Sequence, residues 1–373
     1  MATTFKTFLN NDIATTRTLL HEAIPVTGTI ISGTYNEGDT TTETNIKTYA
    51  HGMFETVYDY PYLSSSANHI LDITVGYAAS SSLSSSDSIQ NAKKINVYNE
   101  MAQVLVPYDI SGNIQGFDQD GNISGGGSKF AEAFFVNFAR LLTKDEIKKG
   151  SFEIDLYTGS LDQKLMTSGT MTISDYGASD TYKVNSPSGE YGLLYTSSAT
   201  ANADSAVGHV YYQAGIAVIT SSVFSTYPTS SGVPNNEWCY FGTFVTGGAS
   251  QKYGTYPYVG VNAVLTGSTM DVFADGVRRR IKNIQFNNTT ELNSTIYFCR
   301  ANTGDFNYSA NPTYTSGSKI LVKGNNPFAE PVSYITTIGL YSADNELLAV
   351  AKLSEPLKKT PSNELTLRVR LDY

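Results

Sequence analysis

The sequence predicts a mainly β fold with an N-terminal α+β part, built from antiparallel β-sandwich or barrel-like domains. Only 16% of the 373 residues are charged, whereas 26 are Tyr and 31 are Gly. Tyr, Thr, Val and Ile suit pleated strands, and Gly, Asn and Ser suit turns. Short alternating segments separated by such turn residues dominate from residue 151 onward, and helical spacing occurs before residue 150. We therefore expect an α+β docking domain over 1–150, a β-rich domain with a loop insertion over 151–280, and an antiparallel β domain over 281–373.

Three helices are expected in the N-terminal part. Apolar residues at roughly helical spacing predict one over residues 1–20 and another over 89–106, which Pro107 ends. The spacing of Phe130, Phe134, Phe138 and Leu142 every four residues predicts a third over 129–149. Ser128 is its expected N-cap, and a Lys-Lys-Gly sequence at 148–150 is its expected end. Strands are expected at residues 25–35 and 69–78.

Strand patterns recur in the rest of the chain. Residues 152–157 alternate apolar and polar side chains, and further strands are expected near 171–173, 191–195 and 207–219. Residues 222–260, rich in Ser, Pro, Gly and Tyr, read as a long loop insertion. After residue 281 we expect about six strands, with a hairpin at 343–346. The last strand, 364–373, alternates strictly between apolar and polar side chains.

The charge balance and cysteine content narrow the function classes. A formal net charge of −9 disfavours nucleic acid as the main partner, because electrostatic binding to phosphates needs clustered Lys and Arg. The short basic run Arg278, Arg279 and Arg280 is interpreted as a solvated strand end or an intersubunit salt-bridge site, with phosphate contact as the lesser alternative. Cys239 and Cys299 lack a metal-ligand pattern, so we expect two buried thiols, and their pairing stays open. No signal peptide is expected, and no apolar run approaches the roughly 18 residues of a membrane span.

Two loops resemble ligand sites only in part. Asp118, Asp120 and Asn122 place oxygen ligands at alternate positions, but Ile123 and Lys129 stand where a calcium loop needs Gly and Glu. A plain turn is therefore expected. Three glycines at 125–127 precede the expected helix, but no P-loop Lys follows in register, so a hinge or tight turn is favoured. His209 is expected to be a packed or rim residue of a strand. We expect no cofactor, no metal and no catalytic residue.

The tyrosine clusters are the one positive functional signal. Tyr joins a large apolar area to a polar tip and is enriched at interfaces. The alternatives are packing in the β core, a subunit interface or stacking against sugars. The candidate interface residues are Tyr49, Phe54, Tyr58, Tyr60, Tyr62, Tyr211, Tyr212, Tyr253, Tyr256 and Tyr258.

Several segments resemble virion structural proteins of tailed bacteriophages, especially those of marine and cyanobacterial phages. They are residues 46–70, 140–150, 210–218 (VYYQAGIAV), 286–300, and 335–341 through to 371–373. The resemblance spans most of the chain and implies a tail, baseplate or neck component present in several symmetric copies. These motifs carry no known chemistry, so the resemblance assigns no catalytic residue.

Together these observations predict a non-enzymatic structural protein of a phage particle. Its expected partners are copies of itself and other virion proteins, and its expected location is the virion, assembled in the host cytoplasm. Membranes are not expected partners. The first alternative is a receptor- or glycan-binding module that uses the Tyr-rich 222–260 region. The second alternative is a glycan hydrolase, but no motif in the sequence indicates one.

Overall fold

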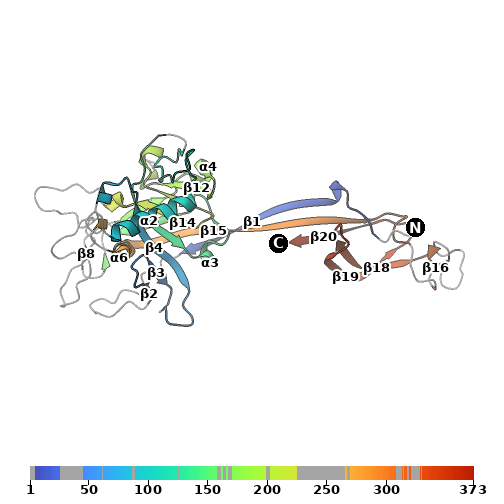
Figure 1. Cartoon of the computed structure of the whole chain (residues 1–373). Coiled ribbons are helices and arrows are strands. Elements are labelled where there is room, and N and C mark those ends of the chain that lie inside the picture. Colours follow the sequence, from blue (N-terminus) through green and yellow to red (C-terminus); the bar gives the residue numbers. More distant parts are fainter. Residues whose placement is uncertain are drawn as a thin grey trace, which may run out of the picture. The chain divides into compact units, whose positions relative to one another are not determined.

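The computed structural model describes residues 5–25, 45–60, 62–85, 89–123, 126–157, 161–162, 165–166, 170–198, 202–224, 265–266, 269–307, 313, 315–316, 319–320, 328 and 330–373 (Figure 1). The chain forms two compact units. Unit 1 comprises Met1–Leu20 and Glu291–Tyr373, and unit 2 comprises His21–Thr290. This division differs from the three consecutive segments expected from composition, because unit 1 joins residues from the two ends of the sequence.

Unit 2 is built on an eight-stranded sheet in which each registered pair is antiparallel. Its central strands are nearly continuous apolar runs, because both faces of the sheet are covered. In spatial order the strands are β11 (Lys183–Asn185), β12 (Gly189–Leu194), β13 (Gly208–Tyr211), β14 (Ile216–Thr220), β5 (Glu132–Phe138), β4 (His69–Tyr77), β3 (Glu55–Tyr58) and β2 (Ile46–Thr48).

Helix α2 (Ile89–Leu105) covers one face of this sheet. Phe135 of β5 meets Tyr98 of the helix, with ring centroids 6.4 Å apart, and Phe117 packs against both rings. The helix comes very close to β4 at Gly76, where a Cβ atom would lie 2.6 Å from the carbonyl oxygen of Lys94. Glycine is therefore required at residue 76 for the helix to lie against the sheet.

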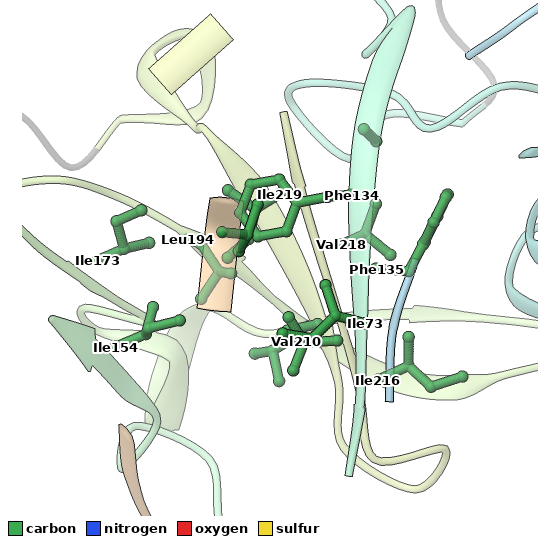
Figure 2. Close-up of a cluster of buried hydrophobic side chains, with 14 of the residues drawn as sticks. Ile73, Phe134, Phe135, Ile154, Ile173, Leu194, Val210, Ile216, Val218 and Ile219 are labelled. Carbon is green, nitrogen blue, oxygen red and sulfur yellow. The ribbon is translucent and has the colours of Figure 1, made fainter. Parts of the chain in front are cut away.

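The other face carries helix α6 (Met270–Arg280) and a second sheet. Phe134, which alternates with Phe135 along β5, lies 6.3 Å from Phe273 of α6. Phe138, on the same face as Phe134, packs 5.2 Å from Phe286 and 5.9 Å from Phe152. The side chains between the two sheets belong to one buried cluster, part of which is drawn in Figure 2. The second sheet contains β7 (Glu153–Tyr157), β10 (Thr170–Ser174), β6 (Glu146–Ile147) and the first half of β15 (Ile281–Ala301).

Shorter elements complete unit 2. They are the helices α3 (Arg140–Thr143) and α4 (Ala178–Thr181), the 3₁₀ turns at Ser82–Ser85, Ala203–Ser205 and Ser221–Phe224, and the hairpin of β8 (Leu161–Asp162) and β9 (Leu165–Met166).

The described residues of unit 1 form strands and one 3₁₀ turn at Asn10–Asp12. Strand β1 (Ile13–Pro25) neighbours β15, and residues 294–301 of β15 pair with β20 (Leu365–Asp372). The other strands form separate two-stranded ribbons, namely β16 (Thr315–Ser316) with β17 (Lys319–Ile320) and β18 (Ser333–Tyr341) with β19 (Leu347–Lys359). Asn345, at φ 63°, closes the β18–β19 turn.

The fold class is confirmed as mainly β with antiparallel sheets and an α+β N-terminal part. The strand at 69–78, the helix at 89–106, the hairpin at 343–346 and the alternating last strand are confirmed. The expected strand at 25–35 lies almost wholly outside the described residues, and so does most of the 222–260 insertion.

Two predicted helices are wrong. Residues 129–149 form strand β5, the single turn α3 and the short strand β6, because an apolar repeat of four also matches one face of a strand. Ala133 and Phe135 between the repeat positions are also buried, so both faces of this segment are covered. Residues 13–20, expected to be helical, belong to strand β1, whose three threonines favour an extended backbone.

Candidate functional site

Unit 1 buries few apolar side chains. Within its described residues, the buried apolar side chains are those of Ile296, Ala301, Leu340 and Val369, and the core cluster of the protein contains none of them. Two-stranded ribbons are marginal in water unless one face is covered. Its large side chains with at least 40% of their surface exposed include Phe5, Leu9, Ile13, Leu19, Leu20, Tyr334, Tyr341, Leu347, Leu348, Val350 and Tyr373.

Unit 1 contains a groove of about 760 Å³. Residues 333–343 all line it, facing the N-terminal segment 5–8 and the end of β15. Successive side chains of a strand point to opposite faces. A groove that touches every residue of β18 must therefore run along the backbone edge of that strand.

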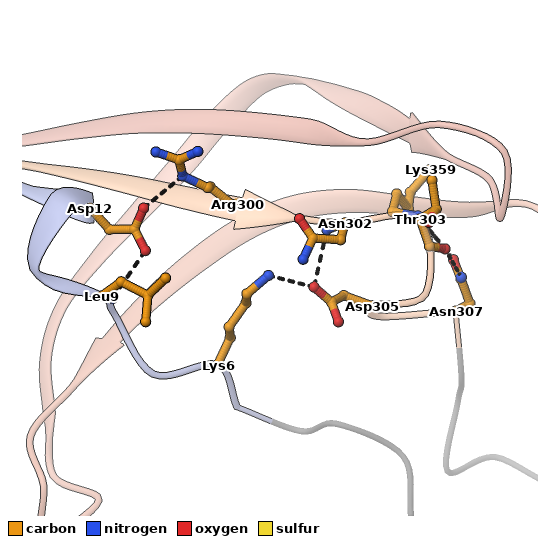
Figure 3. A network of polar contacts seen from close by, with 9 residues as sticks. All are labelled: Lys6, Leu9, Asp12, Arg300, Asn302, Thr303, Asp305, Asn307 and Lys359. Carbon is orange, nitrogen blue, oxygen red and sulfur yellow. Dashed lines mark hydrogen bonds and ion pairs between the residues drawn. The ribbon is translucent and has the colours of Figure 1, made fainter.

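Ion pairs hold the N-terminal segment in place beside the groove. Lys6 Nζ lies 2.6 Å from Asp305 Oδ2, and Arg300 Nε lies 2.6 Å from Asp12 Oδ1 (Figure 3). The backbone N–H of Leu9 donates to Asp12, and this bond, together with Arg300, lowers the pKa of the Asp12 carboxyl. Hydrogen bonding from Lys6 lowers the pKa of Asp305. The two cations and two anions are thus paired with one another, and the other side chains that line the groove carry no charge.

Cys299 also lines this groove. It is half-buried on β15, and burial raises the pKa of its thiol above the ordinary value. A raised pKa disfavours the nucleophilic thiolate. Cys239 lies outside the described residues, so the question of a disulfide between the two stays open.

The structure places the first group of predicted aromatic residues near the two ends of strand β3 in unit 2. Tyr49 stacks on His51 with an interplanar angle of 6° and lies 4.7 Å from Phe54. Tyr58 contacts Tyr62, and both are half-buried. Tyr60 is 60% exposed. Tyr49, His51 and Phe54 therefore form a β2–β3 aromatic surface, and Tyr58 and Tyr62 form a separate contact at the other end of β3. The role of the five candidate residues at an interface stays a prediction.

Tyr211 and Tyr212 lie in the core of unit 2 instead. Both side chains are almost completely buried within the chain's own fold. The Tyr212 hydroxyl donates to Asp175 Oδ2 at 2.8 Å, and Tyr211 contacts His209 Nδ1 at 3.3 Å. Of the three alternatives for the tyrosines, packing in the β core thus applies to Tyr211 and Tyr212. Tyr253, Tyr256 and Tyr258 lie outside the described residues.

The buried carboxyl group of Asp175 accepts several hydrogen bonds next to Tyr212. Besides the tyrosine hydroxyl, it accepts the backbone N–H of Gly150 at 2.7 Å and that of Phe152 at 3.0 Å. Burial raises the pKa of this carboxyl to about 6, against the lowering effect of its hydrogen bonds. Asp175 therefore fixes the turn at 148–152, which leads into strand β7.

The interpretation of the basic run as a solvated strand end is wrong for two of its residues. Arg278 and Arg280 lie at the end of helix α6 and are buried. Arg278 Nε lies 3.3 Å from Glu55 Oε1, and Arg278 also pairs with Asp275. Buried charges need such partners, and the pair with Glu55 ties α6 to β3.

The two ligand-like loops are structural. Asp118 pairs with Lys129, and Asp120 accepts the backbone N–H of Asn122 in a turn, as expected. The glycines at 126 and 127 precede strand β5 and not a helix, so no helix N-terminus lies there. His209 is packed, and burial lowers its pKa to about 4. Among the described side chains, no group of three His, Cys, Asp or Glu is placed to hold a metal ion.

Comparison of the chain with protein-family models, with curated proteins and with solved structures finds no match. In the part of the chain that the structure describes, no helix is long and apolar enough to cross a lipid bilayer.

Proposed function

We propose that this chain is a structural component of a tailed bacteriophage particle, in the tail, baseplate or neck, and that it acts by subunit–subunit assembly. The observation that carries the proposal is that, among its described large apolar side chains, unit 1 buries only Ile296, Leu340 and Val369 and leaves the others half-buried or exposed. Contiguous apolar surface of this kind marks protein–protein contacts. The resemblance of several segments to virion proteins supports the same role, and the location proposed with it is the virion, after assembly in the host cytoplasm.

No sequence or structural feature among the described residues calls for catalysis in this role. The proposed partners are copies of this chain and other virion proteins, held by apolar and aromatic contacts. Interfaces depleted in charge at their centre are typical of such assemblies. The low charge of the whole chain, 16% of its residues, agrees with extensive coverage by neighbours.

The test is the composition and reconstruction of purified particles. We expect mass spectrometry of particles to detect this chain in a fixed ratio to the other structural proteins. A particle reconstruction should then show unit 1 covered by neighbouring subunits. Absence of the chain from intact, infectious particles would refute the proposal.

A second role, in binding receptors or glycans, is favoured by the β2–β3 aromatic surface. There the Tyr49 and His51 rings are stacked, and Lys47 Nζ lies 4.9 Å from the centre of the Tyr49 ring. Flat aromatic faces of this kind also stack on sugars. A glycan array probed with the full-length chain and with Tyr49→Ala tests this role. The role requires at least one glycan that the unaltered chain binds and Tyr49→Ala does not.

A further inference from the structure

Asp118 and Lys129 lie directly opposite each other in unit 2, at an antiparallel bridge between their backbones. The backbone hydrogen bonds on either side run from Gln119 N–H to the Ser128 carbonyl and from Phe130 N–H to the Phe117 carbonyl, each 2.9 Å long. Opposite side chains come closest at such a position, between two hydrogen-bonded pairs. Lys129 Nζ here contacts Asp118 Oδ2. The backbone register therefore holds an amine against a carboxyl group.

The carboxyl group of this pair is buried, whereas the lysine reaches it from the surface. The Asp118 side chain is 3% exposed and the Lys129 side chain is 37% exposed. A Cβ atom on Gly127 would lie 3.5 Å from Asp118 Oδ1, so the backbone of the loop covers that oxygen. Among the described residues, no N–H or hydroxyl group donates to Oδ1. An ionised Asp118 would therefore hold one buried oxygen without a donor, which costs free energy.

A second carboxyl group lies beside the first. Asp118 and Asp120 share a hydrogen bond, and a carboxyl pair of this kind needs a proton on one of its members. Burial raises the pKa of Asp118, and the bond to Asp120 raises it further against the opposing effect of Lys129. The same bond lowers the pKa of Asp120. Asp118 is thus held as the neutral acid, the form that an amine can attack, and Asp120 is held as a carboxylate that can accept a proton.

The turn that carries Asp120 is fixed against strand β12. The Tyr191 hydroxyl donates to the Gly121 carbonyl at 3.1 Å, and a Cβ atom on Gly121 would lie 3.2 Å from Leu193. Tyr191 and Leu193 are themselves buried. The turn therefore keeps the Asp120 carboxylate beside Asp118 and Lys129. Groups held in one arrangement in this way react with a lower barrier than free groups do.

We propose that Lys129 and Asp118 are joined by an amide bond between Nζ and Cγ, which the folded chain forms by itself with the loss of one water molecule. The Lys129 ammonium first releases a proton to solvent. The lone pair of Nζ then attacks Cγ, and the bond between Cγ and one carboxyl oxygen breaks, with its electron pair going to the oxygen. That oxygen takes the proton of the Asp118 carboxyl and one N–H proton, which Asp120 accepts from nitrogen and passes on. The product amide is neutral, so no charge stays buried at residue 118.

The test is trypsin digestion of the denatured full-length chain, followed by mass spectrometry. Trypsin cleaves after Lys and Arg, and Lys129 is the one such residue between Lys94 and Arg140. An amide at Nζ blocks cleavage after Lys129. We expect a single peptide 95–140, lighter than its sequence by the mass of one water molecule. Separate peptides 95–129 and 130–140 would overturn the inference, even if the first had lost water at the bond between residues 120 and 121.

Variants separate this cross-link from other losses of water. Lys129→Arg keeps a cation beside Asp118 but cannot form the amide, so the intact chain should show the full mass of its sequence. A persisting loss of water in Lys129→Arg would overturn the assignment. This cross-link goes beyond the proposed role in assembly, and its test does not depend on whether phage particles contain the chain.

The role of Asp120 is tested by the rate at which the cross-link forms in the freshly translated chain. Asp120→Asn removes the proton acceptor and should slow its formation about a hundredfold. Asp109→Asn, in another turn of unit 2, is the matched control and should form the cross-link at the unaltered rate. An unchanged rate in Asp120→Asn would refute the proton transfer through Asp120.

Discussion

Replacement of Tyr212 by Phe should destabilise unit 2 by an amount that depends on pH. The change removes the hydroxyl that donates to Asp175 at 2.8 Å and leaves the ring in place. The pKa of Asp175 is about 6 in the fold, because the carboxyl is buried, against 3.8 for the ordinary value. Above pH 6 the hydrogen bond is therefore charge-assisted, and its loss should cost about 2 kcal/mol. Below pH 5 the carboxyl is protonated, and the loss should be about 1 kcal/mol.

The direction of the pH effect follows from the raised pKa. Since the folded state holds a proton that the unfolded state releases between about pH 4 and 6, the free energy of unfolding falls as pH rises through that window. The Tyr212 hydroxyl stabilises the ionised carboxylate and so limits this fall. Without the hydroxyl, the pKa of Asp175 should rise further, and the fall should be larger and extend to higher pH.

The assay is a urea series on the full-length chain at pH 5 and pH 8. Pulsed hydrogen exchange of the β5 amides reports the unfolding of unit 2 even if the two units unfold separately. Tyr211→Phe is the matched control, because it removes a hydroxyl beside His209, whose pKa of about 4 keeps it neutral at both pH values. An equal loss for Tyr212→Phe at the two pH values would refute the reasoning.

Three further outcomes test the packing of unit 2 and one of its loops. Gly76→Ala should destabilise the unit by about 1–3 kcal/mol in urea unfolding, because its methyl group would press on the Lys94 carbonyl; no loss would mean that α2 does not contact β4 as described. Phe135→Ala should cost about 3–5 kcal/mol, whereas Ile110→Ala at a fully exposed site should stay within about 0.5 kcal/mol. The backbone N–H of Asn113 is the chief cause that lowers the pKa of the Asp109 carboxyl. The ionised Asp109 should therefore slow hydrogen exchange of the amides in its loop above the ordinary carboxyl pKa, and this protection should disappear as the pH falls. Unchanged hydrogen exchange in Asp109→Ala would contradict this role.

The elements that could be predicted were those marked by a local pattern in the sequence. Pro107 marks the end of helix α2, and the strict alternation of residues 364–373 identifies β20. The error at 129–149 arose because apolar residues four apart lie on one face of a helix and also on one face of a strand. The buried Ala133 and Phe135 between them favour a strand covered on both faces, and that signal was present in the sequence.

The candidate surfaces were harder to predict, because burial depends on distant partners. Tyr58 and Tyr212 both lie in Tyr-rich segments of the sequence. Only the Tyr212 hydroxyl, however, donates to a buried carboxylate, that of Asp175. Arg278 is buried because Glu55 lies across from it, and no local pattern shows that. The groove of unit 1 joins segments about 300 residues apart. The one local sign of it was the uncharged run at 333–341.

The discontinuity of unit 1 has a consequence for biosynthesis. Lys6 pairs with Asp305, and Asp12 pairs with Arg300, across 299 and 288 residues of sequence. At about 5–20 residues per second, the N-terminal segment waits roughly 15–60 s on the ribosome before its partners are translated. Until then, its exposed Phe5 and Leu9 have no place to pack within unit 1.

If copies assemble as proposed, this order of synthesis excludes incomplete chains from the assembly. Translation must pass the second half of β15, β18 and β20 before unit 1 can close, so a chain that ends soon after residue 290 has unit 2 but no finished unit 1. Such a fragment lacks the surface through which copies are proposed to join. Prematurely terminated products would then be kept out of the assembly, and each subunit that enters it would be one whose ribosome had passed β20.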